Sequence, residues 1–273
     1  MSGENGFDAV TRFVEENLEF ATSHYNDSYL QRRIKSRMRR TESDGYLSYL
    51  RLLKSDADEH AKLLDSLSIN VTGFFRNPGV WDGIREALRT LDDEHDAVRI
   101  WSAGCADGRE PYSLAMLALS DPEIDASKVS IVGTDINERA LALAQHGIYE
   151  SNHTSDIDEQ LKYLSHYGSL VERDDERFRV TEDVRRQVSF EKHDLIRDEV
   201  VRRYEMVVCR NLFIYIDPEY KAPVIENILE GLRPKGYLVI GKAETLPPTA
   251  AEKFEIVDSR KRIYRRKAEF LGA

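Results

Sequence analysis

The sequence predicts an α/β protein built on a doubly wound sheet, preceded by a small all-helical domain and interrupted by a small β insertion. Three observations support this fold class. Short apolar runs alternate with helical patterns in the second part of the chain, as in parallel strands joined by crossover helices. The first part has helical periodicity and no such run. A stretch at about 150–182 breaks the alternation.

The apolar runs are bounded by charged or turn-forming residues, as expected for the buried strands of a parallel sheet. A last pair of runs, near the end of the chain, predicts a closing hairpin. In order, the runs are 98–101, 129–135, 188–191, 206–209 and 237–240, followed by 254–258 and 262–266.

Composition is that of an ordinary globular protein. The chain has 273 residues, which is long enough for two domains. Of these residues, 41% are hydrophobic and 32% are charged. A net charge of -10 argues against a general nucleic-acid binder, because phosphate binding depends on basic surface. Two cysteines give no disulfide framework, and no Cys/His cluster predicts a metal site. The polar start is not a signal peptide, and no run approaches the roughly 20 apolar residues of a membrane span.

Helical patterns with apolar faces cover most of the first 70 residues. We therefore expect an N-terminal helical domain over 1–75 and a connecting helix or linker over 76–95. The second domain is expected over 96–273. Within the insertion, the segment 169–180 predicts two short strands around an acidic turn, and a short helix is expected over 161–167.

The most uneven charge lies on the helix predicted over 28–40. Leu30, Ile34 and Met38 recur every four residues and predict its buried face. The remaining positions carry many cations in a chain that is acidic overall. Such a run is often just a solvated face, but its uncompensated charge favours a docking surface for an acidic partner. The cations are Arg32, Arg33, Lys35, Arg37, Arg39 and Arg40.

The segment from Ile69 to Pro78 has no helical period, and Gly73 marks irregular backbone. Two interpretations of its Phe74-Phe75-Arg76 run are open. The rings and the cation could line a cleft, or the rings could anchor a linker in the core.

The stretch from Val98 to Met116 carries the strongest signal. An apolar strand leads into a glycine-containing turn and then a helix, and the next strand ends on Asp135. Glycine lets backbone approach a ligand closely, and the helix start presents unpaired N–H groups. This order is the nucleotide-cofactor half of a Rossmann-like sheet. The spacing Gly104-x-x-x-Gly108 differs from the dinucleotide fingerprint and favours the adenosine of S-adenosylmethionine over that of NAD.

Ligands of doubly wound sheets bind at the carboxyl ends of the strands. Residues that follow the predicted strands should therefore share one edge and form the site. They are Gly104, Glu110, Asp135, Asp194, Arg210 and Asn211.

Five segments match one known family in the same order along the chain. They are LQRRIKSRMRR at 30–40, INVTGFFRNP at 69–78, WSAGCADGREPYSLA at 101–115, VVCRNLFIYID at 207–217 and PKGYLVIGKAE at 234–244. Over about 10–268 the chain resembles the chemoreceptor glutamate methyltransferases of chemotaxis, the CheR family. The resemblance implies a helical domain joined to an S-adenosylmethionine-dependent methyltransferase domain with a β-subdomain. It also implies the activity, methyl esterification of receptor glutamates in sensory adaptation.

The resemblance implies roles for individual residues. Arg76 and Tyr215 are the expected catalytic residues, which orient the substrate carboxylate. Glu110 is expected to contact the cofactor, and Asp135 to hold its ribose hydroxyls. The other residues of the expected cofactor site are Asn70, Thr72, Arg76, Gly104, Asp194, Leu195, Arg210 and Asn211.

Two positions in the glycine turn depart from the family pattern. Arg109 stands where an acid is usual, and Asp107 stands where a small hydroxyl residue is usual. The insertion also matches the family poorly, so a role for it in binding a receptor tail does not follow from the resemblance.

Methyl transfer to a glutamate needs alignment more than proton transfer. The side chain has a pKa near ~4.3 and is already the nucleophile at neutral pH. Alignment can supply roughly 7–11 kcal/mol of a bimolecular barrier. We therefore expect no general base, catalytic thiol or metal.

The expected partner is the acidic, helical methylation region of a chemotaxis receptor, docked on the basic helix. We expect a cytoplasmic monomer that uses S-adenosylmethionine and releases S-adenosylhomocysteine, without nucleic acid or membrane insertion. Two alternatives are a nucleic-acid N-methyltransferase of the same fold and a non-catalytic cofactor-binding scaffold. The first usually has an Asn/Asp-Pro-Pro-aromatic motif after its fourth strand, where this chain has Cys209-Arg210-Asn211-Leu212.

Overall fold

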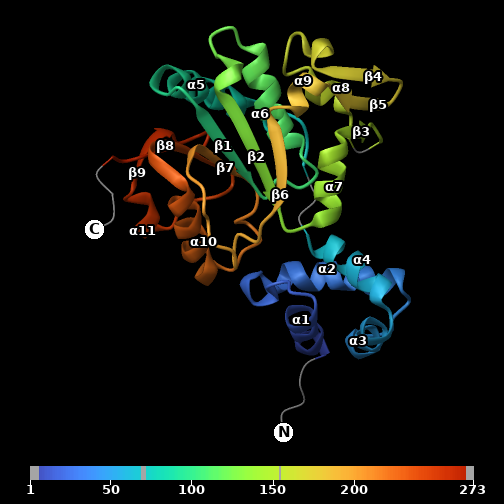
Figure 1. Cartoon of the computed structure of the whole chain (residues 1–273). Helices are drawn as coiled ribbons and strands as arrows, with labels where there is room; N and C mark the ends of the chain where they lie inside the picture. The colour runs from blue at the N-terminus through green and yellow to red at the C-terminus, as the bar shows by residue number, and fades with distance from the viewer. Residues whose placement is uncertain (1–5, 69–71, 154, 269–273) are drawn as a thin grey trace. The chain divides into compact units, whose positions relative to one another are not determined.

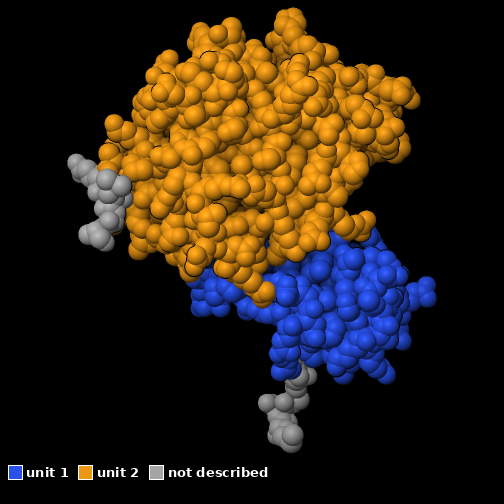
Figure 2. Space-filling model, in the orientation of Figure 1, with its two compact units in different colours: residues 1–69, 213–221 blue, residues 70–212, 222–273 orange. Residues whose placement is uncertain are grey.

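The computed structural model describes residues 6–68, 72–153 and 155–268. The chain divides into two compact units, coloured separately in Figure 2. A helical unit contains residues 1–69 together with 213–221. A second unit, named the catalytic unit for the activity expected of it, contains residues 70–212 and 222–273. The segment 213–221 thus returns from the second half of the chain to join the N-terminal helices.

The helical unit is formed by α1 (Gly6–Asn17), α2 (Asp27–Arg40), α3 (Tyr46–Ser55) and α4 (Ala57–Leu67), with a short 3-10 turn, η1 (Thr22–His24). Each helix has an amphipathic pattern, and the buried positions recur at helical spacing, as in Phe7, Val10 and Val14 of α1. The returning segment is tied on by backbone bonds, since the Asn26 N–H donates to the Tyr215 carbonyl at 3.0 Å.

The catalytic unit contains a seven-stranded sheet of order β6-β2-β1-β7-β8-β10-β9 (Figure 1). The strands from β6 to β8 run parallel, and β10 and β9 close the sheet as an antiparallel pair. This confirms the predicted doubly wound sheet with a terminal hairpin. The strands are β1 (Val98–Ala103), β2 (Val129–Asp135), β6 (Val188–Lys192), β7 (Tyr204–Cys209), β8 (Leu232–Ile240), β9 (Phe254–Asp258) and β10 (Ile263–Arg266).

Helices cover both faces of this sheet. Ser102 of β1 pairs with Gly133 of β2, and both residues face the side of the sheet opposite to that of the Trp101 side chain. A Cβ added to Gly133 would lie 3.0 Å from Pro111 of α6 (Arg109–Ser120), whereas the end of α10 (Pro218–Gly231) packs on Trp101. The remaining helices of the unit are α5 (Pro78–Glu94), α7 (Glu138–His146) and α11 (Pro248–Ala251), with the 3-10 turn η2 (Ala126–Lys128).

The insertion is a separate three-stranded antiparallel sheet of order β3-β5-β4 (Figure 1). Its strands are β3 (Ile148–Glu150), β4 (Val171–Asp174) and β5 (Arg177–Val180), and its helical turns are α8 (Ile157–Leu161), η3 (Tyr167–Ser169) and α9 (Glu182–Arg185). The two strands expected in 169–180 are present. The helix expected over 161–167 lies earlier in the chain, since α8 ends at Leu161. Asp156 caps the start of α8 by accepting from the Glu159 N–H.

The buried core of the catalytic unit includes residues of β1, β2, α5 and α6 together with residues of the insertion, such as Tyr149 and Phe178. The insertion is therefore packed into the unit rather than appended to it. No helix in the described part of the chain is both long and apolar enough to cross a membrane.

Candidate functional site

The glycine turn after β1 has an unusual backbone path. Gly104, Ala106 and Gly108 all have positive φ angles, of 73°, 50° and 87°. The N–H groups of Gly104 and Cys105 both donate to the carbonyl of Thr134, at 2.8 and 2.9 Å. The turn is thereby fixed to the end of β2, beside the start of α6.

Gly108 cannot be replaced without strain. A Cβ at this position would lie 2.6 Å from the Cβ of Ala144 and 2.9 Å from the Phe190 ring. Its left-handed φ is also costly for any residue with a side chain. The glycine therefore lets α6 begin directly against α7 and β6.

Asp135 ends β2 and organises the turn. Its carboxylate accepts from the Ala106 N–H at 2.8 Å and from the Asn137 N–H at 2.9 Å. Burial raises the pKa of this carboxyl, while the bonds from the backbone act in the opposite direction. Asp135 thus presents a desolvated acceptor at the carboxyl edge of the sheet, as a role toward ribose hydroxyls requires.

Glu110 lies in the first turn of α6, beside the ends of β1 and β7. Its carboxylate accepts from the Ser102 hydroxyl at 2.9 Å and pairs with Arg210 at 3.2 Å. Burial raises the pKa of Glu110, and the Arg210 charge partly opposes that rise. The pairing explains how a carboxylate is retained here in a nearly dry environment.

Arg210 connects Glu110 to the segment that carries Arg76. Its Nη2 donates to the Arg76 carbonyl at 2.8 Å and to Asn77 Oδ1 at 3.1 Å. Its guanidinium lies 5.7 Å from the centre of the Trp81 ring, and the indole N–H of Trp81 donates to the same Arg76 carbonyl. Arg210 therefore holds the backbone at Arg76 in place.

Phe74 and Phe75 settle the alternative that the sequence left open for this segment. Their exposed fractions are 2% and 1%, so the rings belong to the core and do not line a cleft. Phe74 packs edge-on against Tyr149, and Phe75 stacks on Tyr163 at 4.8 Å between ring centres. The linker anchored by core aromatics is the correct interpretation.

Asn211 follows Arg210 in a left-handed backbone conformation, with φ of 63°. Glu244, which sequence reasoning did not select, supports it. Glu244 is 3% exposed, and its Oε2 accepts from the N–H groups of Asn211 and Gly241, at 3.1 and 2.5 Å. The sequence offered two signals for Glu244: it is an acid soon after a predicted strand, and it ends the family-like segment 234–244.

Asp194 and Leu195 follow β6 at the same edge of the sheet. The neighbouring His193 N–H donates to the Asp135 carbonyl at 3.2 Å, which brings this segment to the end of β2. Asp194 uses its carboxylate to accept from the Ile196 N–H at 2.9 Å, and Leu195 is buried. Contacts of these two residues with the cofactor remain predictions.

The structure thus brings Gly104, Glu110, Asp135 and Arg210 to one edge of the sheet. Thr72 is half-buried, and Asn70 lies outside the described residues. Tyr215 belongs to the helical unit, where its ring lies 4.7 Å from that of Tyr29. A joint action of Tyr215 and Arg76 on a substrate therefore stays a prediction.

The unusual Arg109 and Asp107 form a pair. Arg109 Nε lies 3.3 Å from Asp107 Oδ2, and its Nη1 donates to the Ser155 hydroxyl at 3.2 Å. The guanidinium also lies 5.1 Å from the centre of the Tyr149 ring, whose hydroxyl donates to the Asp107 carbonyl at 2.6 Å. Arg109 and Asp107 therefore neutralise each other's charge, and their contacts with Ser155 and Tyr149 attach the glycine turn to the insertion.

On α2, the cations differ in what they can contact. Arg37 is buried, with an exposed fraction of 9%, and forms two bonds to Glu59, at 2.9 and 2.7 Å. Its inclusion in the docking surface was therefore wrong, because its charge is already neutralised inside the helical unit. Arg33 is half-buried against the Tyr29 ring. The exposed cations are Arg32, Lys35, Arg39 and Arg40.

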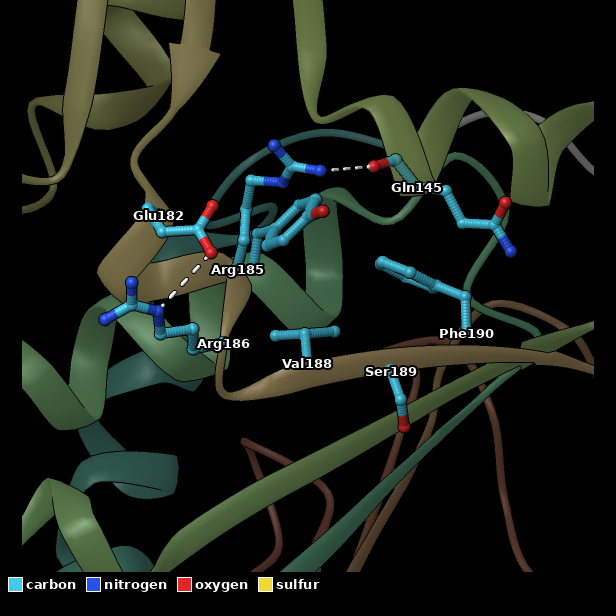
Figure 3. A pocket seen from close by; sticks show the side chains of 8 residues that line it. Gln145, Glu182, Arg185, Arg186, Val188, Ser189 and Phe190 are labelled. Atoms are coloured by element: carbon cyan, nitrogen blue, oxygen red, sulfur yellow. Dashed lines mark hydrogen bonds and ion pairs between the residues drawn. The ribbon is translucent and has the colours of Figure 1, made fainter.

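A cavity of about 280 Å³ lies against β6, between α6, α7 and α9 (Figure 3). Its arginines are engaged, since Arg185 donates to the Gln145 carbonyl and Arg186 to Glu182. No predicted site residue lines it, and we assign it no part in the reaction. Across the described ranges, no group of three His, Cys, Asp or Glu residues is placed to hold a metal ion.

The fold and the site define a doubly wound α/β domain whose carboxyl edge is built for an adenosine-type cofactor. A family model described as the CheR methyltransferase SAM binding domain matches residues 70–263. A second, the CheR methyltransferase all-alpha domain, matches residues 5–68. The chain belongs to the CheR methyltransferase family. It is an S-adenosylmethionine-dependent methyltransferase of chemotaxis.

Curated relatives agree with this assignment. The chain is 31% identical over 238 residues to a chemotaxis protein methyltransferase of Listeria monocytogenes, covering 86% of this chain and 88% of the relative. It is 27% identical over 249 residues to one of Borreliella burgdorferi, covering 87% of each. With chemotaxis protein methyltransferase 2 of Vibrio cholerae, it shares 29% identity over 80% of this chain and 77% of the relative.

Proposed function

We propose that this enzyme methyl-esterifies glutamate side chains of chemotaxis receptors and thereby mediates sensory adaptation. The observation that carries the proposal is the pairing of Glu110 with Arg210, which fixes the backbone at Arg76 on the cofactor edge. This arrangement suits a reaction that depends on orientation. Bound S-adenosylmethionine supplies the methyl group, and the target carboxylate is already ionised at neutral pH.

In this mechanism the protein aligns the reactants rather than moving protons. Asp135 and Glu110 are the desolvated carboxylates that hold the cofactor, and the Arg76 side chain is the cation that orients the target carboxylate. Alignment of this kind supplies roughly 7–11 kcal/mol of a bimolecular barrier. Neither cysteine is suited to nucleophilic attack, because burial raises the pKa of both thiols well above the ordinary value.

The proposal is tested by incubating the enzyme with tritiated S-adenosylmethionine and receptor-containing membranes. Release of tritiated methanol in base identifies a carboxyl methyl ester. Base-stable label would indicate an amine product, as expected of the nucleic-acid N-methyltransferase alternative. Absence of label would indicate a cofactor-binding scaffold.

Arg76→Ala isolates the role of the side chain. The backbone anchor should survive, because Arg210 and Trp81 bond to the Arg76 carbonyl rather than to its guanidinium. We expect methyl transfer to fall at least roughly tenfold, and by much more than the calorimetric affinity for S-adenosylhomocysteine falls. Turnover equal to that of the wild type would refute the orienting role.

We further propose that the exposed cations of α2 dock the acidic helical methylation region of the receptor in the cytoplasm, with the enzyme acting as a monomer. Charge steering of this kind weakens as salt rises, because the Debye length shortens. Receptor affinity should therefore fall with ionic strength, and a salt-independent affinity would contradict the proposal. Arg39→Gln should lower the affinity, whereas Arg203→Gln, an exposed arginine next to β7, should not.

A further inference from the structure

A second basic surface lies on the catalytic unit. A cavity of about 790 Å³ is lined by residues 77–80 at the start of α5, by Lys242 after β8 and by residues 259–262 between β9 and β10. Its charged lining residues are all cations, namely Lys242, Arg260, Lys261 and Arg262. In a chain with a net charge of -10, such a concentration is not expected from composition alone.

Most of this charge is uncompensated. Lys261 pairs with Asp258 at 3.5 Å. Lys242, Arg260 and Arg262 have no carboxylate within 4.0 Å among residues 6–68, 72–153 and 155–268. The Arg262 side chain instead donates to the Lys242 carbonyl at 3.4 Å, which keeps the two segments together.

The sheet places this cavity at its carboxyl edge. β10 runs antiparallel to β8 with Ile263 opposite Val239, and the Ile240 N–H donates to the Arg262 carbonyl at 3.2 Å. The basic turn therefore lies at the carboxyl end of β8, the edge at which the parallel strands present Glu110 and Asp135.

Asn77 links the cavity to the site itself. It lines the cavity, and its Oδ1 accepts from Arg210, which is also bonded to Glu110. One side chain thus separates the cavity from the network that holds the cofactor edge. The cavity is therefore joined to the site through the bond between Asn77 and Arg210.

We propose that this cavity binds acidic side chains that flank the methyl-accepting glutamate on its helical partner, an inference that rests on the proposed function. On a helix, side chains three and four positions apart share one face. Acids neighbouring the target would therefore face the same protein surface as the target. Their charge complements that of Lys242, Arg260 and Arg262.

Nucleic acid fits the cavity less well than an acidic helix. The lining contains no aromatic side chain on which a base could stack. The overall negative charge also opposes a long polyanion, whereas a short acidic segment meets mainly the local cations.

The test is the doubly substituted Lys242→Gln/Arg260→Gln enzyme, in full-length form with receptor-containing membranes. Both side chains are exposed, so the fold should be retained, which circular dichroism checks. We expect the KM for receptor to rise roughly threefold to tenfold and its salt dependence to weaken, as for the loss of two exposed charge contacts. We expect kcat and the affinity for S-adenosylhomocysteine to remain unchanged.

Arg203→Gln is the matched control. Arg203 is exposed and immediately precedes β7, so it lies at the amino end of that strand, opposite the carboxyl edge. Its receptor KM should equal that of the wild type. A receptor whose acids three and four positions from the methylated glutamate are changed to glutamine should give the same KM with the wild-type and doubly substituted enzymes.

The outcomes separate this inference from the proposed function. If the wild type releases no base-labile methanol, the proposed function fails, and the inference fails with it. If the wild type is active and the double variant keeps its receptor KM, only the inference fails. A loss of affinity for S-adenosylhomocysteine in the double variant would also overturn it, because the cavity would then belong to the cofactor site.

Discussion

Replacing Arg37 by alanine should lower the free energy of unfolding of the helical unit far more than replacing any exposed arginine of α2. Arg37 makes two bonds to Glu59, which is 1% exposed and also accepts from the Tyr49 hydroxyl at 2.8 Å. Without Arg37, this carboxylate remains buried and loses the one ion pair that it forms within the described residues. Removal of one partner from a buried ion pair costs about 3–5 kcal/mol, a large share of the 5–15 kcal/mol that typically stabilises a domain.

The pH dependence gives a second signature of the same pair. Burial raises the pKa of Glu59, but the bonds from Arg37 and Tyr49 outweigh burial and hold the pKa below its ordinary value. A carboxylate with a lowered pKa contributes stability above its unfolded-state pKa and loses it as the pH falls through the folded-state pKa. The difference between wild type and Arg37→Ala should therefore be largest at neutral pH and shrink in acid.

The two units can be followed separately in urea. Both tryptophans, Trp81 and Trp101, lie in the catalytic unit, so fluorescence follows that unit while far-ultraviolet circular dichroism follows both. Arg37→Ala should lower the midpoint of the dichroism transition and leave the fluorescence transition nearly unchanged.

Two variants serve as controls for Arg37→Ala. The exposed Arg39→Ala should change the free energy of unfolding by no more than about 0.5 kcal/mol. Arg37→Met with Glu59→Leu removes both charges and should restore much of the lost stability. A helical-unit transition of Arg37→Ala within about 0.5 kcal/mol of wild type would refute the reasoning, a margin set by typical surface substitutions.

Three further predictions concern the cofactor edge. Gly108→Ala should abolish calorimetric binding of S-adenosylhomocysteine and destabilise the catalytic unit by at least about 2 kcal/mol, because its Cβ would overlap Ala144 in a left-handed backbone; normal binding would contradict the role of the turn. Burial raises the pKa of Asp135, so affinity for S-adenosylhomocysteine should fall as the pH falls through the pKa of this carboxyl in the folded protein, while the ligand-free unit gains relative stability. Asp135→Asn should weaken binding and remove that pH dependence, and a persistent dependence would point to another group. Tyr149→Phe loses the bond to the Asp107 carbonyl but keeps the ring. It should lower the free energy of unfolding by about 1 kcal/mol and the affinity for S-adenosylhomocysteine a few-fold. Unchanged stability and affinity would show that the insertion does not support the glycine turn.

Much of the fold could be predicted because its signals are local. A buried parallel strand has a short apolar run, and an amphipathic helix repeats every three to four residues. The edge of the site followed from the same pattern, since Glu110, Asp135 and Arg210 each come soon after a strand. The ends of helices and strands were harder to predict from the sequence. β8 begins at Leu232, before the turn-like residues 234–236. Its pairing with β7 shifts register between Leu232 and Tyr237, and Lys235 is left-handed within this irregular segment.

The sequence by itself determined the order of strands and helices, the glycine turn and the set of polar residues at the carboxyl edge, because each depends on neighbours in the chain. Only the tertiary structure decided which side chains meet. It paired Arg37 with Glu59, supported Asn211 with Glu244, and matched the unusual Arg109 with Asp107 against Tyr149 of the insertion. Such contacts depend on packing and burial, which bring together groups far apart in the chain and remove the water that would otherwise satisfy them.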